Sequence, residues 1–212
     1  KFFLNNKPIF LRLVLNQGFY PDGIWTAPND LELKADVERA MDVGFNGARL
    51  HEKVFEERFH YWADKLGFLT WGEFYDWEIK ADNHQGMSNL KREWYEVVLR
   101  DINYPSIIAW TPYNERADPN VELNRIVVKE TADMTRALDP TRPVNDASGY
   151  VHVATDIFSV HDYDQNPATF FERYDSISPV KKVAFICLPE MSDPYDGQPY
   201  VVDEYGGTHW SV

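Results

Sequence analysis

Short apolar runs alternate with segments of helical periodicity along the whole chain. Residues 68–74 and 107–112 are almost continuously apolar, which is typical of strands buried on both faces. Between them, residues 88–102 carry apolar side chains at helical spacing, with Ser88 as a candidate N-cap. The alternation continues in both directions and predicts a protein built of β-α units.

Seven segments are predicted as strands, at residues 8–15, 45–50, 68–74, 107–113, 142–147, 155–161 and 199–204. Five segments are predicted as helices, at residues 30–43, 54–66, 88–102, 118–138 and 168–174. Asn29 is the expected N-cap of the first helix, and Gly44 and Gly67 are the expected stops of the first two. Residues 183–188 fit either a strand or part of an insertion.

Regular alternation of strand and helix indicates a parallel sheet, and seven strands favour a closed (β/α)8 TIM barrel over an open sheet. Such a barrel usually needs about 250 residues, whereas this chain has 212 and ends soon after Glu204. We therefore expect one domain over residues 1–212, a barrel truncated before its eighth strand, with the last β-α unit missing. The absence of an initial Met also suggests a piece of a longer protein, whose remainder, or a partner, would cover the open strand edge.

Composition and charge exclude several classes of function. The formal charge of -13 would repel a phosphate backbone, so nucleic acid is not an expected partner. No apolar run approaches the roughly 20 residues of a membrane helix, and no secretory signal opens the chain. Cys187 is the single cysteine, which rules out an internal disulfide and leaves the compartment undetermined. Aromatic residues make up 15% of the chain, and these rings either fill the core or cover the faces of sugars.

Polar residues follow the predicted strands, at the end where barrel enzymes keep their chemistry. They are Arg49 and His51, Glu73, the pair Asn114-Glu115, the triplet His161-Asp162-Tyr163, and Glu204. Because parallel strands of a barrel end on one face, we expect these side chains to converge.

Two of the converging residues, Glu115 and Glu204, could together cleave a glycosidic bond. One carboxyl group must be protonated near neutral pH to give its proton to the leaving oxygen. The other must stay ionised to attack the anomeric carbon, which requires nearby donors such as Arg49 or Tyr163.

Motifs over nearly the whole chain, in the right order, resemble the catalytic barrel of glycoside hydrolase family 2, the β-galactosidase and β-glucuronidase family. They are FLNNKPIFLR (3–12), GFNGAR (44–49), DKLGFLTWGE (64–73), RDINYPSIIAW (100–110) with Asn114-Glu115, TRPV (141–144) with Ser148-Gly149, and EYGG (204–207).

The resemblance implies a role for each matching residue. Glu115 is similar to the family's acid/base and Glu204 to its nucleophile, in a retaining double displacement through a glycosyl-enzyme. Asn114 is similar to the residue that hydrogen-bonds the sugar 2-hydroxyl, and Arg49 to the arginine that keeps the nucleophile ionised. His161 and Tyr163 resemble the His-x-Tyr pair of the wider clan.

The sequence departs from the family's pattern around several candidates. Relatives carry a Ser-His-Tyr-Pro-like segment after the arginine, where this chain has Leu50-His51-Glu52-Lys53, so His51 is a weaker candidate. Glu73 is either a substrate contact or one half of a structural ion pair. Trp210 is a candidate for stacking on the sugar. Asp203 precedes Glu204 and is expected to point away from the site, as alternation along a strand requires.

The predicted function is therefore that of a retaining, exo-acting β-glycosidase such as a β-galactosidase or β-glucuronidase. No cofactor is expected, and no metal site is expected because no ligand spacing stands out. The expected partners are a carbohydrate substrate and flanking β-sandwich domains, with an oligomer left open. Two alternatives stay open: a related enzyme that cleaves polysaccharides internally, as β-mannanases and endoglucanases do, and a carbohydrate-binding fragment without turnover.

Overall fold

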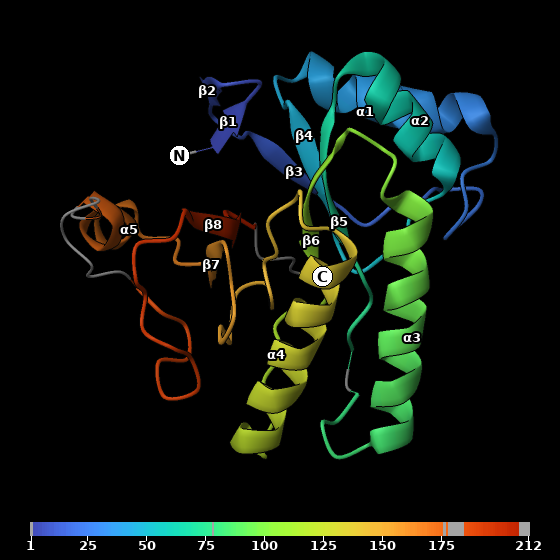
Figure 1. The fold of residues 1–212 in the computed structure, drawn as a ribbon. Coiled ribbons are helices and arrows are strands. Elements are labelled where there is room, and N and C mark those ends of the chain that lie inside the picture. The colour runs from blue at the N-terminus through green and yellow to red at the C-terminus, as the bar shows by residue number, and fades with distance from the viewer. Residues whose placement is uncertain (1, 78, 176, 178–184, 208–212) are drawn as a thin grey trace.

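The computed structural model describes residues 2–77, 79–175, 177 and 185–207 (Figure 1). In this part of the chain the strands are β1 (Phe2–Leu4), β2 (Lys7–Ile9), β3 (Leu13–Asn16), β4 (Gly47–Leu50), β5 (Leu69–Glu73), β6 (Ile107–Thr111), β7 (Phe158–Asp162) and β8 (Tyr200–Tyr205). The helices are α1 (Asp30–Asp42), α2 (Glu57–Leu66), α3 (His84–Asp101), α4 (Val121–Leu138) and α5 (Pro167–Asp175). As far as the described residues go, none of these helices has the length and apolar character that a membrane crossing needs.

The strands that carry the site run parallel and follow chain order. β3, β4, β5 and β6 form one four-stranded sheet, and β7 pairs with β8. Between the two sheets, residues 144–148 join β6 through the isolated bridges Trp110↔Val144 and Asn114↔Ser148. Seven consecutive strand positions therefore follow one another around the sheet, which brings the C-terminal ends of β4, β5, β6, β7 and β8 to one side of the molecule.

Helices packed on the outside of the sheet hold these strands in place (Figure 1). α1 and α2 lie side by side and bury Leu33, Val37 and Phe59 against β4. α3 and α4 also pack together and enclose Trp94 and Trp110. Both buried indoles have a hydrogen-bond partner, since Trp94 donates to Thr135 Oγ1 and Trp110 to Asp139 Oδ2, each at 2.8 Å. These bonds allow the rings to be buried without an unpaired N–H.

Local signals in the sequence explain where the first two helices begin and end. The side chain of Asn29 accepts from the backbone N–H groups of Leu31 and Glu32, so the predicted N-cap of α1 is confirmed. Gly67 has φ +72° and ends α2 in the left-handed conformation that glycine adopts without strain, also as predicted.

The predicted strand at residues 8–15 is wrong, because this stretch belongs to two elements. β1 and β2 form an antiparallel hairpin, and the first strand of the main sheet begins only at Leu13. The hairpin turns at Asn5 and Asn6, which have φ values of +51° and +63°. Positive φ at both central residues is what a tight two-residue hairpin requires, and asparagine tolerates it well.

Other predicted elements also differ from the structure. α4 begins at Val121, three residues later than predicted, with Asn120 as its N-cap. α3 begins one turn earlier than predicted, because Asn83 rather than Ser88 is its N-cap. α2 begins at Glu57, and residues 54–56 are not helical. Residues 142–147 contain one isolated bridge, at Val144, instead of a regular strand. Residues 185–188 have no regular structure, and the rest of the undecided 183–188 segment lies outside the described residues.

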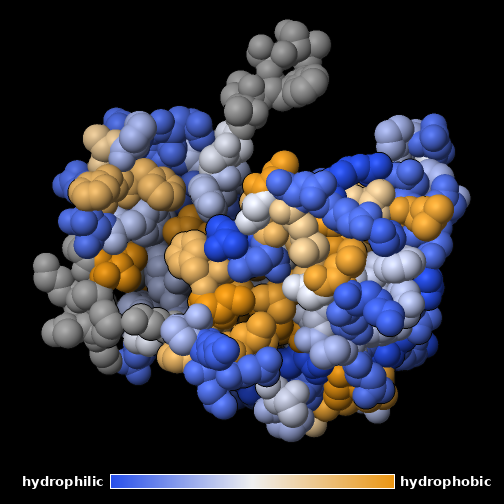
Figure 2. All heavy atoms as spheres, turned by 90° about the horizontal axis from the view of Figure 1, so that it is seen from above, coloured by the Kyte–Doolittle hydropathy of each residue, from blue (hydrophilic) through white to orange (hydrophobic). Residues whose placement is uncertain are grey.

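An apolar groove separates the first and last strands of the barrel. Among the described residues β3 pairs only with β4 and β8 only with β7, so each keeps an open edge. The groove between these edges has a volume of about 700 Å³ and is lined by Phe2, Ile9, Leu13, Leu15, Tyr200 and Val201, among others. Figure 2 shows hydrophobic side chains gathered in the hollow between the part that carries α5 and the part that carries α1 and α2. The barrel is therefore open at one place.

Candidate active site

Arg49, at the end of β4, lies at the centre of the polar cluster. Its side chain is almost completely buried, and it donates to carboxylates on two other strands. Nε and Nη2 donate to the two oxygens of Glu73 at 2.7 and 3.0 Å, and Nη1 donates to Glu204 Oε1 at 2.6 Å. Nη2 also donates to Asn114 Oδ1 at 2.5 Å. One guanidinium therefore fixes the ends of β4, β5, β6 and β8 relative to one another.

Donors surround the carboxylate of Glu204. Besides Arg49, the imidazole Nε2 atoms of His51 and His161 each lie 3.3 Å from Oε1, and the Tyr163 hydroxyl donates to Oε2. Burial by itself would raise the pKa of Glu204, but the hydrogen bonds from His51 and Tyr163 and the charge of Arg49 lower that pKa well below its ordinary value. Glu204 is therefore held as an anion.

Glu115 lies across from Glu204 in a more open environment. It follows β6 with φ +43°, a left-handed conformation that is uncommon outside glycine. His161 Nδ1 lies 2.6 Å from Glu115 Oε1. An oxygen of Glu115 lies within 4.8 Å of an oxygen of Glu204. The Glu115 side chain is 27% exposed, against 6% for Glu204.

The expectation for Asp203 is wrong, because this side chain also points into the barrel. The β7–β8 register shifts between Val160 and His161, so that Val202 faces Val160 and Glu204 faces His161. Asp203 is the extra residue of this β-bulge, which suspends the normal alternation. Its Oδ2 accepts from Ser148 Oγ at 2.7 Å, and its Oδ1 lies 3.4 Å from His161 Nε2.

Ser148 and Gly149 support His161 in a way that the sequence did not reveal. Ser148 Oγ lies 3.0 Å from His161 Nε2. Gly149 has φ +86°, and a Cβ at that position would lie 2.4 Å from the imidazole ring. Ser148-Gly149 was part of the family resemblance, but only the folded chain brings this dipeptide against His161.

The remaining predicted site residues differ in their surroundings. The Glu73 side chain is completely buried, and both of its oxygens accept hydrogen bonds from Arg49. Of the two predicted alternatives, this arrangement is the ion pair and not a surface for substrate contact. Tyr163 is half exposed at the edge of the cluster. His51, the weaker candidate, belongs to the cluster, with Nδ1 2.9 Å from Gln17 Nε2. Trp210 lies outside the described residues.

Among the described residues, one group of three could offer ligand atoms to a metal ion, namely Glu115, His161 and Glu204. The positively charged guanidinium of Arg49 contacts Glu204 and would repel a metal ion bound to that carboxylate. The absence of a metal and of a cofactor stays a prediction.

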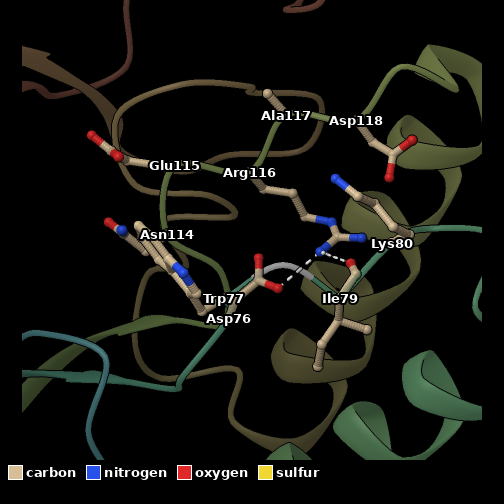
Figure 3. Close-up of a pocket in the computed structure, with 9 residues that line it drawn as sticks. All are labelled: Asp76, Trp77, Ile79, Lys80, Asn114, Glu115, Arg116, Ala117 and Asp118. Atoms are coloured by element: carbon tan, nitrogen blue, oxygen red, sulfur yellow. Dashed lines mark hydrogen bonds and ion pairs between the residues drawn. The ribbon is translucent and has the colours of Figure 1, made fainter.

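A second polar group lies behind Glu115, on the side away from Glu204. Arg116 Nη1 donates to Asp76 Oδ1 at 2.8 Å and to the carbonyl oxygen of Ile79 at 3.0 Å. Figure 3 shows the side chains of Asn114 and Glu115 directed one way from the end of the strand and that of Arg116 the other. Burial raises the pKa of Asp76 to about 6 although the charge of Arg116 lowers it.

The fold and the arrangement of polar side chains at the strand ends define an α/β barrel protein with a paired-carboxylate site. The chain matches the family described as "Glycosyl hydrolases family 2, TIM barrel domain" over residues 1–209, and it belongs to that family. The predicted family and fold class are thereby confirmed.

Named relatives agree with this assignment. The chain is 28% identical over 192 residues to a β-glucuronidase of Bacteroides fragilis, covering 81% of this chain and 27% of the relative. It is 24% identical over 208 residues to a β-galactosidase of Thermoanaerobacterium thermosulfurigenes, covering 97% and 26%. The chain therefore spans about a quarter of the length of these two relatives.

Solved structures show the same fold. A family 2 β-galacturonidase from Eisenbergiella tayi, bound to galacturonate, superimposes with a TM-score of 0.74 at 19% identity, covering 95% of this chain and 36% of that one. A β-glucuronidase from Bacteroides uniformis superimposes with a TM-score of 0.71 at 22% identity, covering 82% and 24%.

Proposed function

We propose that this chain is the catalytic barrel of a retaining, exo-acting β-glycosidase. The observation that carries the proposal is the pair Glu115 and Glu204, whose nearest oxygens lie within 4.8 Å although Glu115 follows β6 and Glu204 is on β8. Retention requires carboxyl groups about 5–5.5 Å apart, whereas inversion needs about 6.5–9.5 Å to admit a water molecule. The short separation favours retention.

The surroundings of the two carboxylates support a division of roles. Glu204, held as an anion by Arg49 and Tyr163, attacks the anomeric carbon and forms a covalent glycosyl-enzyme. Glu115, which is more exposed, protonates the leaving oxygen and then takes a proton from the water that releases the sugar.

Two further residues are proposed to support these steps. Asn114 has its carbonyl oxygen on Arg49, which leaves its NH2 group as the donor for a sugar hydroxyl. His161 bridges the two carboxylates and orients Glu115. Glu73 acts as a positioning residue, because it fixes Arg49 and has no free oxygen for substrate.

We also propose that residues 1–212 form one catalytic domain within a longer protein. The open edges of β3 and β8, and the apolar groove between them, support completion of the barrel by an eighth β-α unit. The partners would be a carbohydrate substrate and flanking β-sandwich domains, with an oligomer as a further possibility. The named relatives are a β-glucuronidase and a β-galactosidase, and β-glucuronides and β-galactosides are therefore the first substrates to test.

The proposal is tested by trapping the glycosyl-enzyme in the full-length protein. A panel of 4-nitrophenyl glycosides first identifies the sugar that is cleaved. The 2-deoxy-2-fluoro glycoside of that sugar, with a dinitrophenol leaving group, should then inactivate the enzyme. Fluorine slows both attack and release, and the activated leaving group speeds up only the attack, so the glycosyl-enzyme accumulates. Peptide mass spectrometry should find the added mass on Glu204. Labelling at another residue, or turnover with inversion of configuration, would overturn the assignment.

A further inference from the structure

The loop that follows β3 reaches the carboxylate cluster through one exposed side chain, that of Gln17. Its amide Nε2 lies 2.9 Å from His51 Nδ1, and the opposite ring nitrogen, His51 Nε2, lies 3.3 Å from Glu204 Oε1. In the described part of the chain the Gln17 side chain has no further hydrogen-bond partner. Gln17 is therefore connected to Glu204 through the imidazole of His51.

The charge of Glu204 determines which nitrogen of His51 carries the proton. Glu204 is held as an anion, and an ionised carboxylate only accepts hydrogen bonds. His51 Nε2 must therefore be the N–H group that donates to Oε1. In a neutral imidazole the other nitrogen, Nδ1, then has only a lone pair and needs a donor. The NH2 group of Gln17 is that donor, whereas an acceptor in its place would draw the proton to Nδ1.

The backbone on both sides of Gln17 is fixed, although its side chain is exposed. On one side Asn16 ends β3, and its carbonyl oxygen accepts from the His51 N–H at 2.9 Å. On the other side the Gly18 N–H donates to Asn16 Oδ1 at 2.8 Å, and the Gly18 carbonyl oxygen accepts from Lys53 Nζ at 2.9 Å. Gly18 has φ +63°, and a Cβ there would lie 2.7 Å from the same Nζ atom. Gln17 thus lies between two anchored residues.

The buried side chain of Lys53 also anchors the far end of this loop. Its Nζ donates to the carbonyl oxygen of Trp25 at 2.7 Å. The same atom lies 5.3 Å from the centre of the Trp25 ring and 4.9 Å from that of Phe55. Burial lowers the pKa of Lys53, and the carbonyl oxygens and aromatic rings take the place of water around its charge. These contacts hold the loop in one arrangement before any substrate binds.

We propose that Gln17 is a positioning residue for the nucleophile, because it selects the tautomer of His51 whose Nε2–H points at Glu204. The inference rests on the proposed function, in which Glu204 attacks the anomeric carbon. The proton on Nε2 helps to keep the carboxylate ionised and in place during that attack. In the other tautomer a lone pair of Nε2 would face Oε1 at 3.3 Å, and the two would repel.

The experiment measures the attack by Glu204 directly, in the full-length protein. The probe is the dinitrophenyl 2-deoxy-2-fluoro glycoside that tests the proposed function. Glu204 forms the bond to the anomeric carbon and dinitrophenolate leaves with its bonding pair, so this step needs no proton. Gln17→Met keeps the length of the side chain and removes the donor. The rate constant of inactivation should fall about fivefold, the size of one net hydrogen bond, while the dissociation constant of the probe changes less than about twofold.

A double-mutant cycle separates this role from general support of the loop. His51→Phe removes the imidazole, so adding Gln17→Met to it should change the inactivation rate constant by less than about twofold. Mass spectrometry of the intact protein counts labelled molecules, so the rate can be followed even if His51→Phe reacts very slowly. A fivefold loss from Gln17→Met in both backgrounds would show that Gln17 does not act through His51, and would overturn the inference.

The pH profile is a second measurement that a purely structural role would not change. The hydrogen bond from His51 is one cause of the lowered pKa of Glu204. In Gln17→Met that pKa should rise toward its ordinary value, because the donating tautomer is no longer enforced. The carboxylate then protonates at higher pH, and the acid limb of the kcat/KM profile should move upward by about half a pH unit.

Gln85→Met is the matched control, because Gln85 is an exposed residue of α3 whose Nε2 donates to Asn89 Oδ1 at 3.1 Å, outside the cluster. Its inactivation rate and pH profile should equal those of the wild type. If either the rate or the acid limb is unchanged in Gln17→Met, the inference about Gln17 fails while Glu204 still takes the label. If the wild type takes no label, the proposed function fails and the inference fails with it.

Discussion

The two facing carboxylates have opposite surroundings. Glu204 is buried, and both of its oxygens are occupied by donors from β4 and β7 or the residues that follow them. The Glu115 side chain is 27% exposed, against 6% for Glu204, and its backbone is in the left-handed conformation. The difference shows that one fold can place two chemically identical side chains in opposite surroundings, one buried among donors and the other partly open to solvent.

The contrast between the two carboxylates predicts its largest effect on activity when the charge of Glu204 is removed. Glu204→Gln should lower kcat in the full-length protein by about 10⁴-fold or more, because no other side chain in the cluster is placed to form the covalent bond. The measurement is hydrolysis of the best 4-nitrophenyl glycoside, with circular dichroism to verify the fold. Activity close to that of the wild type would discard the nucleophile assignment.

Removal of Glu115 should instead produce a loss that depends on the leaving group. Glu115→Ala should lower kcat/KM by about 10²–10⁴-fold for alkyl glycosides and disaccharides, which need a proton. Dinitrophenyl glycosides need none, so their first step should be spared. Azide, a small anion that requires no base, should then accelerate turnover and yield the β-glycosyl azide. If azide has no effect on rate or product, Glu115 is not the acid/base.

The buried ion pair between Arg49 and Glu73 can be removed while Glu204 and Asn114 stay in place. Glu73→Ala leaves a buried guanidinium without its bidentate partner and should lower the free energy of unfolding by about 3 kcal/mol, the lower end of the range for such losses, because Glu204 and Asn114 still accept from Arg49. Urea unfolding followed by tryptophan fluorescence measures it. Glu73→Gln keeps the volume and separates the effect of charge from that of the cavity. Full stability of both variants would mean that Glu73 does not stabilise the buried Arg49 side chain.

The smallest predicted effect comes from removing the hydrogen bond that Tyr163 donates to Glu204. Tyr163→Phe removes one donor, so the pKa of Glu204, lowered in the folded protein, should rise toward its ordinary value. The carboxylate then protonates at higher pH, and the acid limb of the kcat/KM profile should move upward by about one pH unit, with roughly a tenfold loss of rate. An unchanged profile would show that Arg49 and the histidines suffice.

Much of the architecture could be predicted from periodicity and caps. The α1 cap at Asn29 and the α2 stop at Gly67 depend on neighbours only a few residues away, so local chemistry determines them. The strand-end residues were identifiable because parallel strands of a barrel end on one face, whatever their distance in sequence.

Features that depend on register or on contacts between loops could not be predicted. Alternation along a strand gave the wrong direction for Asp203, because a bulge depends on pairing with β7 and has no local signature here. Ser148 and Gly149 meet His161 only after the irregular 144–148 segment is placed beside β6.

The bulge at Asp203 has a mechanical consequence for β8. Among the described residues this strand pairs with β7 alone, yet two consecutive side chains extend from it into the lumen, Asp203 to Ser148 and Glu204 to Arg49. β8 is thus held by side-chain hydrogen bonds across the interior of the barrel as well as by its backbone pairing with β7. Thermal fluctuations of the open side should therefore reach the Glu204 carboxylate only after these side-chain contacts break.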